Sequence, residues 1–485
     1  MVDIIQVEKY DETYIKVKAE PSVMMEMSDF FTFTVPGAQF TPKFRAKVWD
    51  GKIRLLNTMT GLIYYGLLSY IEEFCHKREY QIEYLSDFST EEFSIKEAKE
   101  FIAKVKPTFQ PRDYQLDAFV HAVRERRSLL LSPTASGKSF IIYLLVRYYA
   151  KRTLIIVPTT SLVSQLASDF ADYGFDSATY VHRVFSGQDK GTTKPITIST
   201  WQSIYKLPKD FFSNFDVVIG DEAHLFKAKS LTSVLTKLSG CRYRFGFTGT
   251  LDGTQTHRLV LEGLFGPVRK VTTTSELIEQ KHLADFKIKA IVLNYPEEVR
   301  KMIARSSDYQ AEMDYLVRLE ARNKFIRNLA LSLEGNTLLL FQYVEKHGKA
   351  LFNELTREAD KSRNVFFVSG EVSGEDREGI RKITEGENDA IIVASFGTFS
   401  TGVNIRNLHN IIFASPSKSR IRNLQSIGRG LRKSETKTSS TLYDIADDMS
   451  WKNKKNYTLL HFMERIKTYN EEKFEYKIYK VSLEV

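Results

Sequence analysis

The chain is poor in cysteine and has no long apolar run. Only 2 of its 485 residues are cysteines, Cys75 and Cys241, and no second cysteine lies near either one. This scarcity excludes a disulfide-rich fold and a cysteine-based zinc site, and it favours two free thiols in a reducing compartment. The apolar run 140–146 stops at Arg147, far short of the ~20 residues that span a bilayer. Because the first residues also lack a signal-peptide core, we expect a soluble, cytoplasmic protein without a membrane partner.

Length and charge indicate several domains and a polyanionic partner. A chain of 485 residues exceeds one ordinary core and suggests about three domains of roughly 100–200 residues each. The net charge of +9 favours nucleic acid as the partner, although surplus lysines can equally form a solvated face. The net charge alone therefore does not identify the partner, and the motifs are needed to do so.

Hydrophobic patterning divides the chain into four segments, 1–95, 96–275, 276–450 and 451–485. The first is predicted to be a small basic α/β domain with strands at 14–18 and 52–56 and a helix at 67–77. A charged helix and linker, 89–106, leads into the second segment. The last segment is predicted to be an amphipathic helix, 459–474, with a charged tail, and we expect it to pack back on the sheet of the third segment.

Two series of short apolar runs predict two parallel sheets. The first series is 129–131, 154–157, 196–198, 217–219 and 245–247, and the second is 338–341, 365–368, 391–394, 411–414 and 441–445. Helical stretches separate the runs, which is typical of α/β folds with helices on both faces of a sheet. The predicted fold class is α/β, with two tandem parallel-sheet domains behind the small domain. Ligands of such folds bind at the carboxyl ends of the strands.

A predicted phosphate-binding loop follows the first run of the first series. Its candidate nucleotide-binding residues are Pro133, Thr134, Ala135, Ser136, Gly137, Lys138 and Ser139. Gly137 lets the backbone approach the phosphates, and the next helix points its N-terminal amides at the anion. Lys138 would neutralise β/γ-phosphate charge, and the Ser139 hydroxyl would bind Mg²⁺. The pattern departs from the usual one only at Ser132, where a glycine is common.

An acidic cluster, Asp221–His224, follows the run 217–219. Asp221 would hold Mg²⁺, and Glu222 would orient and deprotonate the attacking water. The alternative is an acidic first turn of a helix, which the helix dipole favours by itself. His224 is either a packed helix residue or a signalling residue toward the second domain. Together with the phosphate loop, the cluster predicts hydrolysis of ATP with Mg²⁺ as cofactor.

Two further segments contain candidate nucleotide contacts. The segment 425–432 supplies three candidate catalytic residues, Gln425, Arg429 and Arg432. Its two arginines lie three apart and would share a helix face, either as fingers toward a γ-phosphate or as a surface that binds solvent or nucleic-acid phosphates. Arg112 and Gln115 precede the phosphate loop, where a glutamine amide could pair with adenine and select ATP.

Cations and aromatic residues alternate in the N-terminal segment 43–54. The candidate nucleic-acid contacts there are Lys43, Arg45, Lys47 and Trp49. Cations bind phosphates, and exposed aromatic faces stack on unpaired bases. The alternative is a β-hairpin with Trp49 in its core and a polar outer face. The sequence leaves both alternatives open.

The order of these motifs resembles helicase superfamily 2 across roughly residues 107–435. The ordered motifs are Arg112/Gln115, Gly137–Ser139, Pro158–Thr160, Asp221–His224, Thr248–Thr250, Gly402–Asn404 and Gln425–Arg432. The resemblance implies two RecA-like domains with ATP between them, and it implies that Gly402 and Asn404 approach the ribose. The implied nucleic-acid contacts are Pro158, Thr159, Thr160, Thr200, Trp201, Gln202, Phe341, Gln342 and Gly370. The implied coupling residues, which link hydrolysis to that track, are Thr248 and Thr250, with His224 beside them.

The segment Phe44–Arg54, with Tyr173 and Trp201–Ser203, narrows the resemblance to the UvsW family of T4-type bacteriophage recombination helicases. This implies ATP-dependent unwinding and branch migration of Holliday junctions, forks, D-loops and R-loops in phage recombination, repair and replication. The implied partners are branched and single-stranded DNA, RNA–DNA hybrids, and phage recombination or single-strand-binding proteins in the host cytoplasm. Two alternatives from other classes are a motor subunit of a restriction-type complex and a nucleotide-regulated nucleic-acid-binding protein that separates no strands.

Overall fold

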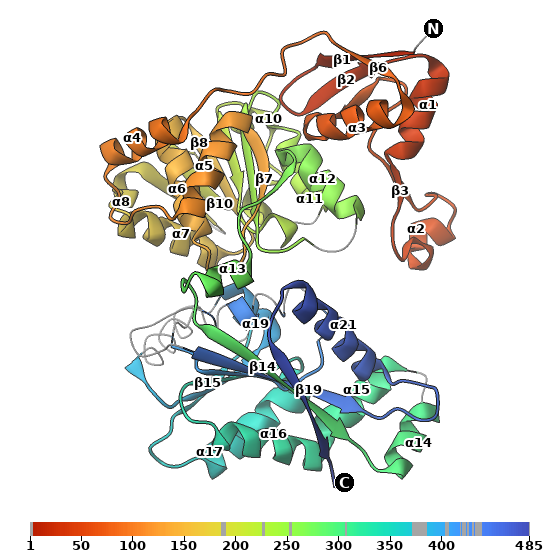
Figure 1. The fold of residues 1–485 in the computed structure, drawn as a ribbon, viewed down its shortest axis with the longest axis vertical. Helices are drawn as coiled ribbons and strands as arrows, with labels where there is room; N and C mark the ends of the chain where they lie inside the picture. Colours follow the sequence, from red (N-terminus) through yellow and green to blue (C-terminus); the bar gives the residue numbers. More distant parts are fainter. Residues whose placement is uncertain are drawn as a thin grey trace. The chain divides into compact units, whose positions relative to one another are not determined.

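The chain divides into two compact units, Met1–Ser132 with Gly137–Thr272 and Pro133–Ser136 with Thr273–Val485 (Figure 1). The computed structural model describes residues 3–185, 191–225, 228–251, 255–305, 308–370, 386–402, 407–417, 419, 423, 426–428, 431 and 439–484. Side chains are described at all of these positions except 228, 229, 255–257 and 400–402. The predictions made for Asn404, Gln425, Arg429 and Arg432 concern residues outside the described part.

A small mixed sheet begins the first unit, with the order β5-β2-β1-β6. Its elements are β1 (Ile4–Lys9), β2 (Tyr14–Lys18), α1 (Pro21–Phe30), β5 (Leu62–Tyr64), η2 (Tyr65–Leu67), α3 (Leu68–Arg78) and β6 (Gln81–Tyr84). Buried and more exposed residues alternate along β1 and β2, so Ile5, Val7 and Ile15 face one apolar core together with Met27 and Phe74 from the helices. The predicted strand 14–18 and helix 67–77 are therefore confirmed.

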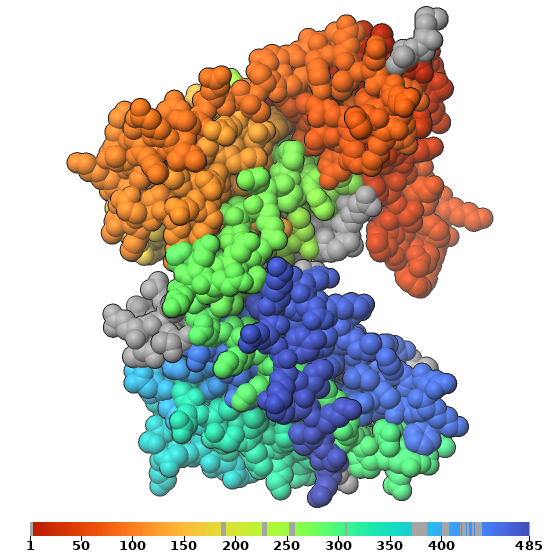
Figure 2. Space-filling view, in the orientation of Figure 1, coloured from red at the N-terminus to blue at the C-terminus, as the bar shows by residue number. Residues whose placement is uncertain are grey.

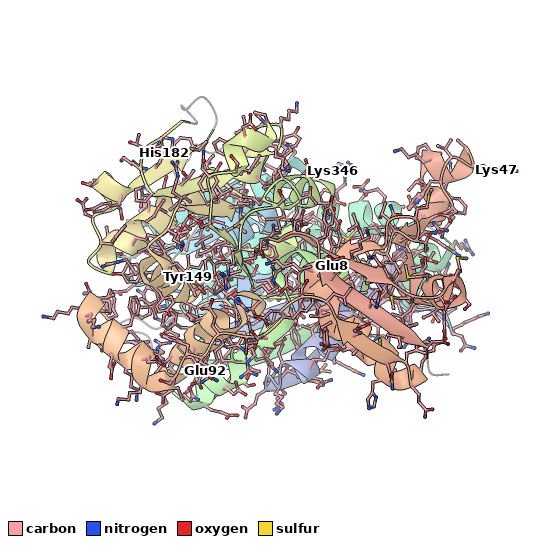
Figure 3. All side chains as sticks on the ribbon, turned by 90° about the horizontal axis from the view of Figure 1, so that it is seen from above. Glu8, Lys47, Glu92, Tyr149, His182 and Lys346 are labelled. Carbon is pink, nitrogen blue, oxygen red and sulfur yellow. The ribbon has the colours of Figure 1, made fainter. Side chains whose placement is uncertain are left out.

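A separate lobe, residues 32–54, leaves this domain between α1 and β5. This N-terminal lobe consists of β3 (Thr32–Thr34), η1 (Ala38–Phe40), α2 (Pro42–Arg45) and β4 (Lys52–Arg54), with β3 and β4 antiparallel. Figures 1 and 2 show the lobe projecting from the small domain, and Lys47 lies at its outer end (Figure 3). The predicted strand 52–56 is shorter than expected, because the ladder with β3 ends at Arg54.

Seven parallel strands form the sheet of the first larger domain, in the order β13-β7-β12-β11-β8-β10-β9. The strands are β7 (Arg127–Leu131), β8 (Thr153–Val157), β9 (Val181–Val184), β10 (Ile196–Thr200), β11 (Val217–Gly220), β12 (Tyr243–Thr248) and β13 (Val268–Lys270). Each predicted run falls inside a strand. Successive residues of a strand point to opposite faces of the sheet, so Leu154 and Ile155 pack in two different apolar cores. Both faces have a core because helices cover both.

The helices of this domain connect successive strands. They are α4 (Ile95–Val105), α5 (Asp113–Glu125), α6 (Lys138–Tyr149), α7 (Thr160–Asp172), α8 (Ser177–Tyr180), α9 (Trp201–Ile204), α10 (Lys209–Phe212), η3 (Ala223–Leu225), α11 (Ala228–Leu235) and α12 (Gln255–Phe265). The predicted linker helix is α4, which starts with a reciprocal capping box between Ser94 and Glu97.

Two buried arginines join the small domain to the amino ends of this sheet. Arg127 opens β7, donates to Glu12 Oε2 at 3.1 Å and lies 3.6 Å from the centre of the Tyr65 ring. Arg244 occupies the paired position on β12, is fully buried, and donates to the Thr13 hydroxyl at 2.8 Å. The small domain therefore attaches at the edge opposite to the one where ligands of such a sheet bind.

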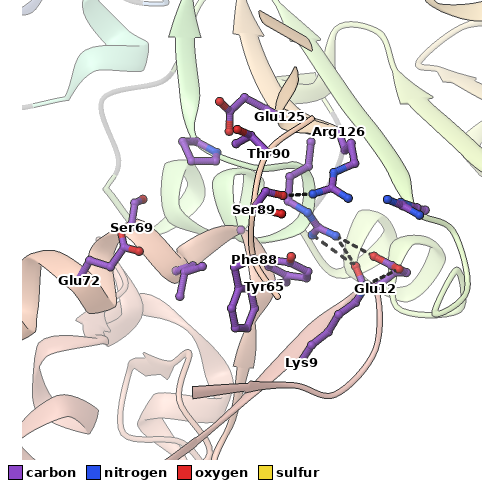
Figure 4. A pocket seen from close by; sticks show the side chains of 15 residues that line it. Lys9, Glu12, Tyr65, Ser69, Glu72, Phe88, Ser89, Thr90, Glu125 and Arg126 are labelled. Carbon is purple, nitrogen blue, oxygen red and sulfur yellow. Dashed lines mark hydrogen bonds and ion pairs between the residues drawn. The ribbon is translucent and has the colours of Figure 1, made fainter. Parts of the chain in front are cut away.

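The same junction is closely packed. A Cβ at Gly66 would lie 2.0 Å from the Glu262 carbonyl oxygen of α12, so only glycine fits there. A cavity of about 290 Å³ remains beside this contact, and Lys9, Glu12, Tyr65 and Arg126 are among the residues that line it (Figure 4). The small domain and the first sheet consequently form one compact unit.

The second unit contains a second sheet of seven parallel strands, in the order β16-β17-β15-β18-β19-β14-β20. The strands are β14 (Asp285–Asn294), β15 (Thr337–Phe341), β16 (Val365–Val368), β17 (Ile391–Ser395), β18 (Asn410–Phe413), β19 (Ser439–Asp448) and β20 (Tyr476–Ser482). The helices are α13 (Thr274–Glu279), α14 (Glu297–Arg305), α15 (Tyr309–Arg318), α16 (Glu320–Ser332), η4 (Val344–Gly348), α17 (Lys349–Glu358), α19 (Phe396–Gly402) and α21 (Tyr457–Glu471). The predicted α/β class with two tandem parallel sheets is confirmed.

The predicted charged tail was wrong in one respect. Residues 476–482 form the edge strand β20, which pairs in parallel with β14 from Ile288 to Asn294. The helix before it, α21, spans 457–471 rather than 459–474 and lies against β19. The segment after residue 450 is therefore part of the second sheet domain.

The described part of the chain contains neither a disulfide nor a helix that could cross a bilayer. Cys75 and Cys241 are buried free thiols, as predicted. Burial raises the pKa of the Cys75 thiol to about 11 and that of Cys241 to about 12, so both are unreactive at neutral pH. No helix among the described residues is long and apolar enough to cross a bilayer.

Candidate nucleotide site and nucleic-acid track

The phosphate loop lies between the carboxyl end of β7 and the first turn of α6. Ala135 and Gly137 adopt positive φ angles of 67° and 78°, and the Ser136 hydroxyl donates to the Pro133 carbonyl at 2.7 Å. The φ of Gly137 favours glycine, and a Cβ there would also lie 2.4 Å from Gln115 Nε2 and displace that amide. Left-handed residues in such a turn gather backbone N–H groups into an anion-binding concavity, to which a helix N-terminus adds.

The acidic cluster at the end of β11 reaches this loop. Lys138 Nζ donates to Glu222 Oε1 at 2.5 Å, and both side chains are more than four-fifths buried. Asp221 accepts the Glu222 backbone N–H at 3.0 Å. Burial raises the pKa of Asp221 to about 6, although the Lys138 ammonium opposes this shift. Glu222 adopts φ 51°, and non-glycine residues in this conformation cluster at functional sites.

The predicted cofactor residues offer oxygen ligands at this edge of the sheet. Asp221 contributes a half-buried carboxylate and Ser139 a hydroxyl, and Mg²⁺ prefers such hard oxygen donors. The Ser139 hydroxyl lies 2.7 Å from the Tyr173 hydroxyl, and the Tyr173 ring packs against Phe140 and Tyr143. No motif assigned a functional role to Tyr173, because it is 34 residues from Ser139 in the chain and follows none of the motifs.

Gln115 is nine-tenths buried and fixed between its own helix and the phosphate loop. Its Oε1 accepts the Arg112 N–H at 2.9 Å, and its Nε2 donates to the Gly137 carbonyl at 3.4 Å. The Arg112 guanidinium donates to the Tyr114 hydroxyl at 2.9 Å. The structure therefore places Gln115 at the loop, and its contact with adenine stays a prediction.

The three predicted coupling residues form one buried hydrogen-bonded chain. His224 Nδ1 lies 2.6 Å from Thr248 Oγ1, which donates to the Thr250 carbonyl at 2.6 Å. Because the single hydroxyl proton of Thr248 goes to that carbonyl, the proton between the two side chains belongs to His224 Nδ1. The His224 ring is also 3.5 Å from Glu222 Oε2. The chain thus leads from the acidic cluster to the end of β12.

Two predicted track segments meet at the carboxyl ends of the paired strands β8 and β10. Gln202 Nε2 donates to the Pro158 carbonyl at 3.3 Å. Thr159 caps α7 by accepting the Leu162 N–H at 3.4 Å, so Thr160 opens a 13-residue helix. Thr200 Oγ1 lies 2.8 Å from the Ser203 hydroxyl, and the half-buried Trp201 packs edge-on against Tyr205. This helix N-terminus, with hydroxyls beside it, suits a phosphate.

The second domain keeps only part of the predicted track at its surface. The Phe341 ring is fully buried and stacks on Phe367 with a centroid separation of 5.6 Å. This corrects the expectation for its side chain, which belongs to the apolar core of the second sheet domain. Gln342 follows β15, Gly370 is exposed, and Gly402 ends α19.

The N-terminal lobe presents cations and apolar side chains to solvent. Lys43, Arg45 and Lys47 are exposed, as are Phe40 and Val48, at 70% and 77%. Trp49 is half-buried and donates from Nε1 to the Lys52 carbonyl at 2.8 Å. Both alternatives for this segment were therefore incomplete: Trp49 neither fills a hairpin core nor stands free.

The phosphate loop, the acidic cluster and the two parallel sheets identify the class of protein. A phosphate loop and an acidic cluster on one of two RecA-like parallel sheets are the motor of a superfamily 2 helicase. Residues 76–253 match the family "Type III restriction enzyme, res subunit", and residues 4–85 match "DNA helicase UvsW, N-terminal". The ATP-dependent DNA helicase uvsW of Enterobacteria phage T4 is 37% identical over 506 residues, which cover 99% of this chain and 100% of that protein. The chain belongs to the UvsW family of ATP-dependent DNA helicases.

A solved structure of this family agrees with the assignment, and two other proteins are more distantly similar. The crystal structure of T4 UvsW matches with a TM-score of 0.52 and 35% identity over 99% of this chain and 100% of that chain. A Type ISP restriction-modification enzyme bound to DNA, LlaBIII, reaches a TM-score of 0.58 at 15% identity over 86% of this chain and 34% of that one, which is a likeness of fold alone. The DNA 3'-5' translocase XPB2 of Sulfurisphaera tokodaii is 24% identical over 363 residues, covering 68% of this chain and 80% of that protein.

Proposed function

We propose that this helicase acts on branched DNA, and that it unwinds and branch-migrates Holliday junctions, forks, D-loops and R-loops. The observation that carries the proposal is the N-terminal lobe, which presents Lys43, Arg45 and Lys47 to solvent beside exposed apolar side chains. A motor that follows a phosphate backbone reads little of the DNA's branching, so a second surface must select a junction. The lobe is such a surface, and Arg127 and Arg244 tie its domain to the first motor sheet.

Side chains at the nucleotide site divide the work of ATP hydrolysis. Lys138 exchanges its contact with Glu222 for the phosphates, where its charge is needed. Glu222, released from Lys138, orients and deprotonates the attacking water. Asp221 and Ser139 hold Mg²⁺, which when bound neutralises charge on the phosphates. Arg429 and Arg432 stabilise charge that develops on the γ-phosphate, and Gln425 completes the set from the second domain.

The remaining assignments follow the path of the DNA. On the first domain, the phosphates of one strand are held by Pro158–Thr160 and Thr200–Gln202. On the second domain, the track continues over Gly370 and over the residues between β15 and η4, 342–343, called the Gln342 loop. The chain His224–Thr248–Thr250 relays the state of the acidic cluster to that track. On such substrates the enzyme serves phage recombination, repair and recombination-dependent replication in the host cytoplasm. RNA–DNA hybrids are a further substrate, and recombination and single-strand-binding proteins are the expected partners.

Unwinding of a static four-way junction tests the proposal directly. The test compares wild type with Lys43→Glu/Arg45→Glu/Lys47→Glu and with a control of equal charge change, Lys96→Glu/Lys99→Glu/Lys104→Glu, whose lysines are exposed on α4. The lobe variant should lose junction affinity, and its salt slope should flatten by roughly 0.9 per lost phosphate contact. Its ATPase on single-stranded DNA should persist. Equal junction affinity and equal slopes in all three proteins would place junction selection elsewhere, and a wild type that opens only linear duplexes would reject the proposal.

A further inference from the structure

The loop that follows β18 connects elements that are distant in the sequence. Ser415 in this loop is almost fully buried. Its hydroxyl oxygen accepts the Gln342 backbone N–H at 3.1 Å and lies 3.0 Å from His347 Nδ1. Gln342 follows β15 and is a proposed nucleic-acid contact, whereas His347 belongs to η4. One hydroxyl therefore holds the Gln342 loop and η4 to the end of β18.

The same loop is held again two residues later. The Ser417 carbonyl accepts Arg465 Nη1 at 3.1 Å and Asn423 Nδ2 at 3.4 Å. Arg465 comes from α21, is 1% exposed, and is fixed by Asp444 at 2.8 Å. Asn423 belongs to the segment that continues in the sequence to Arg429. Only Pro416 separates the two serines, and its ring fixes its own φ and restricts the backbone of Ser415, so a shift of Ser415 is passed on to Ser417.

His347 lies in an energetically unfavourable environment for a polar side chain. The residue is fully buried in a π-helix, a rare element that is frequent at functional sites. Burial lowers the pKa of His347 to about 3, so the ring is neutral. Its Nε2 has no hydrogen-bond partner within the described part of the chain, which is unfavourable for a buried polar atom. A Cβ at Gly348 would lie 2.4 Å from the Phe341 ring, so close packing holds this element against β15.

We propose that Ser415 is a positioning residue that links DNA bound at the Gln342 loop to the arginine-bearing segment, residues 423–432, which contains Arg429 and Arg432. Through this link Ser415 sets how strongly DNA stimulates ATP hydrolysis. The inference rests on the proposed roles of Gln342 and Arg429. DNA that binds the Gln342 loop moves the N–H that Ser415 accepts. The short span to Ser417 carries that displacement to Asn423, at the start of the arginine-bearing segment.

A matched pair of serine substitutions tests this link. Ser415→Ala removes the hydroxyl at the carboxyl end of β18. Ser440→Ala removes an equally buried hydroxyl at the amino end, where Ser440 donates to the Leu408 and His409 carbonyls at 3.3 and 3.2 Å. The readout is the ratio of kcat with saturating single-stranded DNA to kcat without DNA. Ser415→Ala should lower this ratio about three- to tenfold, the equivalent of one net hydrogen bond, with DNA affinity and ATP KM unchanged. Ser440→Ala should keep the wild-type ratio.

A second pair separates positioning from packing. His347→Asn keeps a polar group near the position of Nδ1, whereas His347→Leu removes it at similar volume. The asparagine variant should retain the wild-type ratio, and the leucine variant should match Ser415→Ala. The link is overturned if Ser415→Ala and Ser440→Ala give the same ratio, or if asparagine is no better than leucine. A wild type whose ATPase ignores DNA would reject the proposed track as well, so the two failures are distinguishable.

Discussion

The two parallel sheets are of equal size but use buried charge differently. In the first sheet, Lys138 Nζ donates to Glu222 Oε1 at 2.5 Å, and Asp221 accepts a backbone N–H. In the second sheet, Arg322 donates to both oxygens of Asp447 at 2.8 and 3.0 Å, and Tyr295 adds a third hydrogen bond at 2.7 Å.

A second buried group in this sheet repeats the arrangement. Arg465 donates to both oxygens of Asp444 at 3.1 and 2.9 Å, and the Tyr469 hydroxyl adds a bond at 2.8 Å. Burial, aided by the neighbouring carboxylate, raises the pKa of both tyrosines well above the usual value. A buried pair with three hydrogen bonds serves the architecture, since it fixes α16 and α21 to β19. The Lys138 ammonium lies at the phosphate loop, where a ligand can take over its contact with Glu222.

The sharpest way to break this comparison is to remove charge from the first sheet. Lys138→Ala and Glu222→Gln should both abolish ATPase, but by different routes. Without Lys138 the phosphate charge is uncompensated, so nucleotide binding weakens. Without the Glu222 carboxylate only the water stays unactivated, so ATP binds and remains trapped. Filter binding of labelled ATP beside steady-state hydrolysis separates the two, and substantial turnover by Glu222→Gln would remove that residue from its assigned role.

Arg429→Ala extends the comparison to the second domain. An arginine finger acts on transition-state charge and is worth ~10³–10⁵ in rate. We therefore expect kcat to fall by that factor while DNA affinity stays at the wild-type value. Arg357→Ala, an exposed arginine on α17, is the control and should leave both unchanged. If DNA affinity falls and hydrolysis survives, Arg429 belongs to the nucleic-acid track instead.

Removing charge from the second sheet should change stability rather than chemistry. Arg322→Met leaves Asp447 buried without its cation, which costs about 3–5 kcal/mol. The unfolding temperature of that unit should drop by roughly 6–20 °C, as followed by calorimetry. The triple variant Arg322→Met/Asp447→Leu/Tyr295→Phe should recover most of the loss, because no buried polar group is then left unpaired. A triple variant as unstable as the single one would show that the pairing itself stabilises the fold.

The smallest expected effect concerns Tyr173. Tyr173→Phe keeps the ring packing and removes only the hydroxyl that lies 2.7 Å from Ser139. If that contact orients Ser139 for Mg²⁺, the Mg²⁺ concentration for half-maximal ATPase should change about three- to tenfold, one hydrogen bond's worth. An unchanged Mg²⁺ titration would mean that Tyr173 contributes packing alone.

The sequence predicted the position of the motifs on the first sheet better than the buried ion pairs of the second. The phosphate loop and Asp221–His224 could be placed because each follows an apolar run, and parallel strands bring their carboxyl ends together. Arg322 and Asp447 could not be paired, because they lie 125 residues apart and a lone charge in a helix reads as solvated.

Edge positions were the other failure. In β20 the charged residues Lys477 and Lys480 are exposed, as is common on edge strands that must not pair further. The same charges suggested a tail. At Phe341 the error ran the other way, because a motif position at a strand end was taken for a surface side chain. β15 is an interior strand of its sheet and is buried along its whole length, the last residue included, because helices cover both faces of such a sheet.

The most direct test of the central claim compares Glu222→Gln with Arg322→Met in the same assays. ATPase per folded molecule, below the unfolding temperature of both, and the unfolding temperature itself are measured on one preparation of each. We expect Glu222→Gln to lose hydrolysis and keep its unfolding temperature, whereas Arg322→Met should keep hydrolysis and unfold at a lower temperature. The reverse pattern, or loss of both properties in both variants, would contradict the division of buried charge between chemistry in the first sheet and architecture in the second.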